Sequence, residues 1–224
     1  LKYDAPLTSD VVGVATPMSD WVRTSTSPSD LAVAGAESVA SALTYPGQIC
    51  TLIAPGDHAW TDGAKVSASV TPPETERPKS AEIKEAATLL KSSGQSALFL
   101  GGRALREDAL FHAGRIAAAT GARLICETLP ARLQRGAGRV EVERLPYFAE
   151  MATECLSDLE QMIFIGAKPP VAFFAYPGKP SWLSPRSATL FEFHKTSIDA
   201  ESTLRRLADE LAAVSYTHLT LPTT

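Results

Sequence analysis

The stretch Ser96-Ala-Leu-Phe-Leu-Gly-Gly-Arg-Ala-Leu-Arg106 decides the fold class of this chain. A short apolar run ends in a pair of glycines, and a pattern typical of a helix follows. This succession predicts a strand that passes through a tight turn into a crossover helix, which is the repeating step of an open parallel sheet. The stretch therefore predicts an α/β domain.

The same alternation extends over residues 81–213. Helical apolar patterns alternate with strand-like runs, which begin at residues 97, 123, 162 and 189. We expect this segment to form a Rossmann-like, doubly wound parallel sheet with helices on both faces. Ser80 and Ser197 are the expected N-caps of its first and last helices.

Residues 1–64 carry a smaller α/β pattern. A candidate strand at 21–25 is followed by Ser27-Pro28, which is typical of a helix start. Leu31, Val39 and Leu43 are the expected apolar face of that helix. Residues 49–54 form an apolar run that predicts a buried parallel strand.

Two segments differ in composition from the rest of the chain. Residues 65–80 contain three prolines within 70–78 and no apolar period, which predicts an extended linker and a domain boundary. Residues 214–224 are uncharged and rich in threonine, and they resemble the translation of a sequencing-adapter read-through. We expect this tail to be artefactual, and a genuine strand and loop is the alternative.

The composition narrows the classes of function. The net charge is −4, from 25 acidic and 21 basic residues, and no cluster of Lys and Arg marks a nucleic-acid surface. No apolar stretch reaches the roughly 18–20 residues that a membrane helix needs. Cys50, Cys126 and Cys155 are widely spaced and fall in apolar patterns, as reduced thiols of a cytoplasmic protein do.

Catalytic and metal-binding patterns are not apparent. The four histidines are isolated in the sequence, and no pair of cysteines has the spacing of metal ligands. The chain has neither a G-x-S-x-G elbow nor a P-loop. We therefore assign no metal ligand and no catalytic residue.

The glycine turn is the first candidate for ligand binding. The backbone amides of Gly101-Gly102-Arg103 could hold a phosphate at the start of the following helix, although the full G-x-G-x-x-G pattern is missing. A tight turn without a ligand is the alternative. Glu127, after the next strand, is a candidate partner for a ribose hydroxyl.

Two loops are further candidates. Arg132, Arg135 and Arg139 could bind an anion or could form a solvated surface. Residues 173–178, Phe-Phe-Ala-Tyr-Pro-Gly, are too apolar for an idle exposed loop. They could pack against another domain or a subunit, line a pocket, or cap the sheet.

The order of these segments resembles one family of enzymes. The chain looks like the interior of an acetolactate synthase-like, thiamine diphosphate-dependent enzyme, of the group that includes benzoylformate decarboxylase. The resemblance rests on six segments: residues 2–10, 21–25, 46–57, 97–103, 135–138 and 173–180. The first three resemble the later part of a pyrimidine-binding domain, and the last three resemble the central domain.

The resemblance implies thiamine diphosphate held by a divalent metal such as Mg²⁺ at the interface of a homo-oligomer, a dimer or tetramer. It implies a small 2-keto acid as substrate, which loses carbon dioxide before the fragment is released or transferred. It also implies FAD or another adenine nucleotide in the central domain of some members. Gly101, Gly102, Arg103 and Gly166 would lie at the strand ends beside such a nucleotide.

The same resemblance places the chemistry outside this chain. The activating glutamate of the family precedes the matched region, and its G-D-G…N motif for metal and diphosphate follows it. We therefore expect these 224 residues to be an inactive fragment of a decarboxylating or carboligating enzyme. The alternative is a non-catalytic paralogue or a nucleotide-binding regulatory module.

Overall fold

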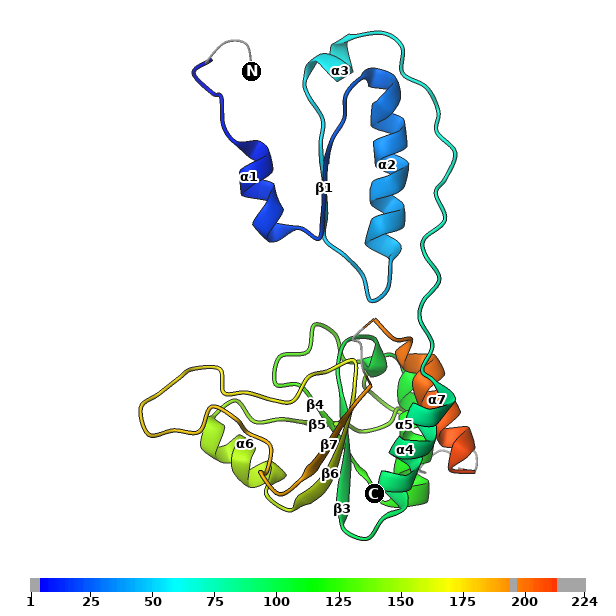
Figure 1. The fold of residues 1–224 in the computed structure, drawn as a ribbon, viewed down its shortest axis with the longest axis vertical. Coiled ribbons are helices and arrows are strands. Elements are labelled where there is room, and N and C mark those ends of the chain that lie inside the picture. The colour runs from blue at the N-terminus through cyan, green and yellow to red at the C-terminus, as the bar shows by residue number, and fades with distance from the viewer. Residues whose placement is uncertain (1–4, 194–196, 213–224) are drawn as a thin grey trace. The chain divides into compact units, whose positions relative to one another are not determined.

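The computed structural model describes residues 5–193 and 197–212, and the chain forms two compact units, Leu1–Thr75 and Glu76–Thr224 (Figure 1). The predicted tail at 214–224 lies outside the described residues.

The first unit is built on two parallel strands. β1 (Trp21–Thr24) pairs with β2 (Cys50–Ile53), with Trp21 opposite Cys50, and α2 (Pro28–Leu43) connects them. Ser27 caps α2 as predicted, because its side chain accepts a hydrogen bond of 3.1 Å from the Asp30 amide. Three short helical segments complete the described part of the unit: α1 (Val11–Ala15), η1 (Thr16–Met18) and α3 (Asp57–Trp60).

The predicted apolar face of α2 is wrong in part. Val39 and Leu43 are 59% and 67% exposed, whereas the buried residues of the helix are Ala34 and Ala40. Alanine side chains are short, so the helix backbone can approach its neighbours closely on that side. The bulkier residues of α2 are left on the surface of the unit.

The second unit contains a five-stranded parallel sheet in the order β5-β4-β3-β6-β7. These strands are β3 (Gln95–Leu100), β4 (Arg123–Cys126), β5 (Glu143–Arg144), β6 (Leu159–Ile165) and β7 (Thr189–Glu192). The chain adds β4 and then β5 on one side of β3, and then β6 and β7 on the other side. This reversal is the topology of a doubly wound, Rossmann-like sheet, as predicted.

Helices cover both faces of this sheet. α4 (Ser80–Lys91), α5 (Glu107–Thr120) and α7 (Ala200–Glu210) gather on one side, and α6 (Ala149–Leu156) lies on the other (Figure 1). Successive strand residues point to opposite faces, and both faces are apolar. On the α6 side, Phe99 and Phe164 lie with ring centroids 5.4 Å apart.

Both predicted helix caps of this unit differ from the structure. Asp199 caps α7, because its side chain accepts a hydrogen bond of 3.0 Å from the Ser202 amide; Ser197 lies two residues too early. Ser80 is the first residue of α4 and not its cap. The amide of Lys79 instead donates to the side chain of Glu82 at 2.7 Å.

Candidate functional site at the carboxyl edge of the sheet

The predicted glycines come together at the point where the strand order reverses. β3 and β6 are adjacent and parallel, so Gly101, which follows β3, meets Gly166, which follows β6. The Gly101 amide donates to the Ile165 carbonyl at 3.1 Å. In open α/β sheets, ligands bind in the crevice outside the carboxyl ends of the strands at such a switch point.

The two strand ends pack against each other through their backbones. A Cβ atom on Gly101 would lie 2.5 Å from the carbonyl oxygen of Gly166, and one on Gly166 would lie 2.6 Å from that of Gly101. Gly166 also has a φ of +68°, which side chains disfavour. This mutual approach is a packing reason for both glycines, whether or not a ligand binds.

Gly102 and Arg103 open the short helical turn η2 (Gly102–Leu105), and both are exposed. Gly102 adopts a φ of +51°, so the chain turns sharply as it leaves β3. Their exposure leaves room for a ligand above the glycine contact. The assignment of Gly101, Gly102, Arg103 and Gly166 as nucleotide-binding residues stays a prediction.

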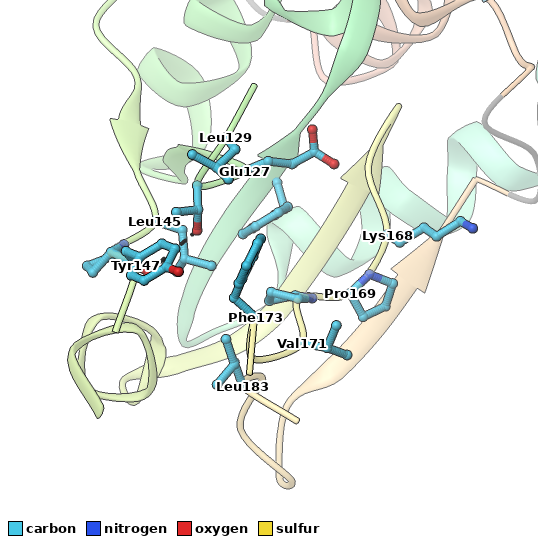
Figure 2. A pocket seen from close by; sticks show the side chains of 13 residues that line it. Glu127, Leu129, Leu145, Tyr147, Lys168, Pro169, Val171, Phe173 and Leu183 are labelled. Atoms are coloured by element: carbon cyan, nitrogen blue, oxygen red, sulfur yellow. Dashed lines mark hydrogen bonds between the residues drawn. The ribbon is translucent and has the colours of Figure 1, made fainter. Parts of the chain in front are cut away.

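A pocket of about 370 Å³ adjoins this contact on the α6 side of the sheet (Figure 2). Three segments that follow strands line it, together with one strand residue, Phe99. The lining residues are Phe99, Glu127, Thr128, Leu129, Leu145, Pro146, Tyr147, Lys168, Pro169, Pro170, Val171, Phe173 and Leu183. An apolar pocket with few polar groups is the usual form of a small-molecule site.

Glu127 is the chemically notable residue of this pocket. It is half-buried, and no hydrogen bond or ion pair joins it to any other residue that the structure describes. Burial disfavours its ionised form and raises the pKa of the carboxyl group above its ordinary value. The carboxyl carbon of Glu127 lies 3.0 Å from the position that a Cβ on Gly101 would take. Glu127, the predicted partner of a ribose hydroxyl, is therefore a neighbour of the glycine turn.

Lys168 supplies the positive charge at the same pocket. It is exposed, and in Figure 2 its side chain extends away from Glu127. The sequence signal for both residues is their position, because Glu127 follows β4 and Lys168 follows β6 within a few residues. Residues that directly follow parallel strands lie at the same edge of a sheet. This rule predicts the position of Lys168 as well as that of Glu127.

The arginine-rich loop contacts the start of α5 through some of its residues and exposes others to solvent. Arg139 forms an ion pair of 2.7 Å with Glu107, at the start of α5. Gln134 also binds this region, since its amide donates to the Leu105 carbonyl at 3.1 Å. Arg132 and Arg135 belong to the same loop, and both are exposed.

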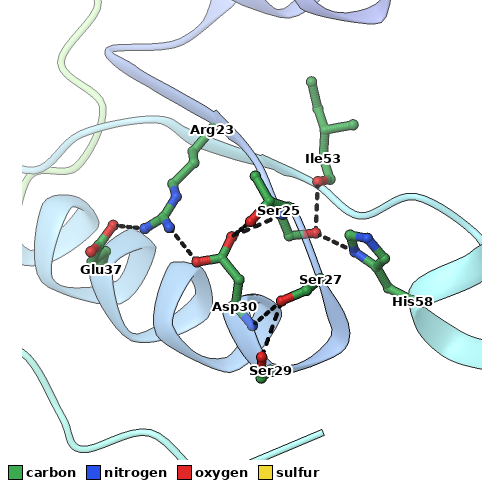
Figure 3. Close-up of polar contacts among 9 residues, drawn as sticks. Arg23, Ser25, Ser27, Ser29, Asp30, Glu37, Ile53 and His58 are labelled. Carbon is green, nitrogen blue, oxygen red and sulfur yellow. Dashed lines mark hydrogen bonds and ion pairs between the residues drawn. The ribbon is translucent and has the colours of Figure 1, made fainter. Parts of the chain in front are cut away.

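A polar cluster in the first unit was not predicted (Figure 3). The guanidinium group of Arg23 bridges Asp30 and Glu37 on α2. Next to it, the buried Ser25 hydroxyl lies 2.8 Å from Nδ1 of His58 and 3.4 Å from the Ile53 carbonyl. Ser25 and His58 are 33 residues apart in sequence, so only the pairing of β1 with β2 brings them together.

The Ser25–His58 pair lacks the rest of a catalytic arrangement. A nucleophile and base normally need a third group that orients the base. The described part of the chain places no acid in hydrogen-bond contact with His58, and Ser25 is only 2% exposed. The pair therefore ties the end of β1 to the start of α3.

Metal ligation and membrane insertion find no support within the described ranges. No group of three His, Cys, Asp or Glu side chains there could hold a metal ion. No helix of those residues is long and apolar enough to cross a membrane. His194 and His218 lie outside the described residues.

Comparisons with known proteins point to one family. No protein-family model matches the chain. The chain is 42% identical over 211 residues to "Putative acetolactate synthase large subunit IlvX" of Mycobacterium tuberculosis, which covers 94% of this chain and 40% of the relative. The chain thus spans less than half the length of this relative.

Solved structures show the same fold at lower identity. One is described as a "putative thiamin diphosphate-dependent enzyme" from Mycobacterium smegmatis; it has a TM-score of 0.73 and 19% identity, and the match covers 93% of this chain and 42% of that one. Another, benzoylformate decarboxylase from Polynucleobacter necessarius, has a TM-score of 0.71 and 18% identity over 95% of this chain and 42% of its own. The chain is therefore similar in sequence to a segment of an acetolactate synthase-like large subunit, and it has the fold of the corresponding part of thiamine diphosphate-dependent enzymes.

Proposed function

We propose that the parent protein of this segment decarboxylates a small 2-keto acid and then transfers or releases the remaining fragment, as an acetolactate synthase-like enzyme. The observation that carries this proposal is the 42% identity over 211 residues, which extends through both units of the chain. Thiamine diphosphate, when bound, supplies the carbanion chemistry. We further propose a homo-oligomeric parent in the cytoplasm, where the three free cysteines of this chain would remain reduced.

In this proposal the 224 residues are framework and not catalytic machinery. The described residues contain no cluster of side chains that could hold Mg²⁺, and no nucleophile–base–acid arrangement. The residues that hold thiamine diphosphate and Mg²⁺ would then be supplied by parts of the parent outside this chain. The segment alone would therefore be inactive, and the domain division into 1–64, a linker at 65–80 and a central domain at 81–213 is part of the same proposal.

We also propose that the switch point holds an adenine nucleotide, FAD or another. The unpartnered Glu127 carboxylate supports this, because it could accept hydrogen bonds from a ribose at the end of the second strand. The exposed Gly102 and Arg103 would face the phosphates. The Gly101–Gly166 contact fills the space between the strand ends, so these two glycines would shape the floor of the site.

Turnover assays on the parent test the first proposal. The parent, loaded with thiamine diphosphate and Mg²⁺, is incubated with pyruvate and a series of larger 2-keto acids, and carbon dioxide and acetolactate are measured. We expect turnover by the parent and none by the 224-residue chain. Cofactor binding without turnover by the parent would favour the non-catalytic paralogue, and turnover by the chain alone would contradict the assignment of the catalytic residues.

Calorimetric titration of the chain tests the nucleotide proposal separately. FAD and ADP are the probes, and Glu127→Gln is the variant, with Glu141→Gln as the exposed control. We expect saturable binding that Glu127→Gln weakens about tenfold, in line with the loss of a charged hydrogen bond. If neither nucleotide gives a measurable heat of binding, the proposal that the switch point binds an adenine nucleotide is contradicted.

A further inference from the structure

The contact between α5 and α7 contains a polar network that has no role in the proposals above. Among the described elements, α7 has its most extensive contact with α5, and both helices lie on the same side of the sheet (Figure 1). The network joins His112 and Arg115 of α5 to Asp209 of α7. We call these three residues the helix-contact network.

The hydrogen bonds of this network fix the protonation state of His112. Nδ1 of His112 lies 3.2 Å from a terminal nitrogen of the Arg115 guanidinium group. A guanidinium group only donates hydrogen bonds, so Nδ1 is the acceptor and carries no proton. The imidazole is therefore neutral in this contact, with its proton on Nε2.

Arg115 connects this imidazole to α7. Both of its terminal nitrogens lie 3.3 Å from Oδ1 of Asp209, and the side chain of Arg115 is only 15% exposed. Leu207 and Ala208 directly precede Asp209 and are fully buried. The helix-contact network therefore holds the C-terminal part of α7, where the apolar contact of that helix ends.

Charged groups of both signs act on His112 from each of the two helices. Arg115 on α5 and Arg205 on α7 disfavour its protonation. Asp108 on α5 and Asp209 on α7 favour it, so the charges partly cancel. Burial has the largest influence, followed by Arg115, and the pKa of His112 is lowered from its ordinary value as a result.

We propose that the contact between α5 and α7 is an acid-sensitive switch, in which protonation of His112 loosens the C-terminal part of α7. A proton on Nδ1 turns the acceptor of the Arg115 hydrogen bond into a donor, so that two donors face each other. The new positive charge also lies beside the guanidinium group that connects α5 to Asp209. The inference uses only contacts within the second unit, and it does not depend on the proposed reaction or nucleotide.

The direction of the pH effect follows from the neutral imidazole. The closed contact binds the proton less tightly than the loosened contact does, because only the closed contact uses Nδ1 as an acceptor. The closed contact therefore has its full stability above the ordinary pKa of histidine, which is about 6.5. This stability is lost as the pH falls from that value through the lowered pKa of His112.

Nuclear magnetic resonance of the 224-residue chain tests this inference without any substitution. The imidazole signals of His112, assigned through the backbone, give the midpoint of its titration. Hydrogen exchange of the Leu207 and Ala208 amides, corrected for intrinsic rates, gives the opening of α7 at pH 7.5 and at pH 5.0. We expect a midpoint below about 6.5. We also expect an opening equilibrium about tenfold larger at pH 5.0, in line with the loss of a charged hydrogen bond.

His112→Gln is the matched variant. Its side-chain oxygen can accept the hydrogen bond of Arg115, but the group does not titrate. We expect the opening of α7 in this variant to be the same at both pH values. His58→Gln, which changes a histidine of the first unit, is the control and should keep the pH dependence of the wild-type chain.

Two results would overturn the inference. One is a titration midpoint of His112 at or above the ordinary value, which would show that the closed contact does not exclude the proton. The other is an opening of α7 that responds to pH in the same way in the wild-type chain and in His112→Gln. The first result needs no variant, so it decides the question even where a substitution prevents folding.

Discussion

A Cβ atom on Gly101 would lie 2.5 Å from the carbonyl oxygen of Gly166, so the ends of β3 and β6 meet backbone to backbone. Two neighbouring parallel strands can approach this closely only where neither turn carries a side chain. The contact lies at the switch point of the sheet, and it therefore sets the shape of the edge at which a ligand would bind.

Three glycine-to-alanine variants separate the steric and conformational parts of this contact. Gly121→Ala tests positive φ alone, because Gly121 has a φ of +75° and no atom within 4 Å of the position that a Cβ would take. We expect it to cost about 1 kcal/mol. Gly101→Ala, with extended backbone, tests the clash alone, and Gly166→Ala combines both.

We expect Gly101→Ala to cost at least about 2 kcal/mol, and Gly166→Ala to cost more than either other variant. Urea unfolding of the chain, followed by far-UV circular dichroism, measures the differences. Equal costs for Gly121→Ala and Gly166→Ala would show that the backbone contact adds nothing to the strain of positive φ.

Glu127→Gln should stabilise the chain at neutral and higher pH. The folded state raises the pKa of Glu127, so it binds the proton more tightly than the unfolded state does. Stability is then lost as the pH rises from the ordinary pKa of a glutamate through the raised value. Because glutamine carries no charge, the variant lacks this loss.

We expect Glu127→Gln to be more stable by about 1 kcal/mol at pH 7.5, the scale of a buried polar group without a partner, and the difference should shrink towards pH 4. Thermal unfolding across this pH range measures it, with the exposed Glu141→Gln as control. A difference that does not change with pH would contradict the role of burial.

Cys155 should change its alkylation rate in opposite directions in two variants. Its thiol donates to Glu143 at 3.1 Å and lies 3.4 Å from the Arg123 guanidinium. Burial and then Glu143 raise the pKa of the thiol, whereas Arg123 lowers it. The thiolate is the reactive form, so Glu143→Gln should speed alkylation and Arg123→Gln should slow it, each by about threefold.

Reaction with iodoacetamide at pH 8, quantified on the Cys155 peptide, measures these rates. Cys126 is fully buried and serves as the unreactive reference in the same chain. Faster reaction in both variants would indicate loosened packing and would contradict an electrostatic cause.

Asp199→Ala should destabilise the second unit through the start of α7. The variant removes the acceptor of the Ser202 amide and leaves one helix N–H without its partner. We expect a loss of about 1 kcal/mol in urea unfolding. Ser197→Ala is the matched control and should change stability by less than about 0.5 kcal/mol, because Ser197 precedes the cap by two residues.

The sheet of the second unit was predictable because its main strands are continuous apolar runs in the sequence. Residues 97–100 and 162–165 are buried on both faces, so each run is apolar throughout and ends visibly at a glycine. β5 was not predicted, since Glu143–Arg144 is two residues long and exposed. Its place in the sheet comes from pairing with Ile125 and Cys126.

The helix details needed the tertiary structure. Ser197 and Asp199 are both good capping residues, and only the path of the chain into α7 chooses between them. In α2 the apolar period favoured Val39 and Leu43, but close packing selected the alanines. Sequence patterns report which residues are apolar, and they do not report how near the neighbouring backbone lies.

The sequence predicted only those residues of the candidate site that directly follow a strand. Gly101, Glu127 and Gly166 were identified because each follows a predicted strand. The pocket beside them also needs Leu145, Tyr147 and Leu183, which come from loops without a recognisable motif. Their meeting depends on the order of the strands, which no local pattern specifies.

The bridge between Val171 and Trp182 closes the aromatic loop, which contains residues 173–178, at its base. The residues between the two bridge positions can therefore be lengthened, shortened or exchanged without shifting the register of β6 or β7. Doubling the length of such a loop costs only about 0.6 kcal/mol in closure entropy. Related proteins can therefore differ in the length and sequence of this loop while the sheet that carries it stays the same.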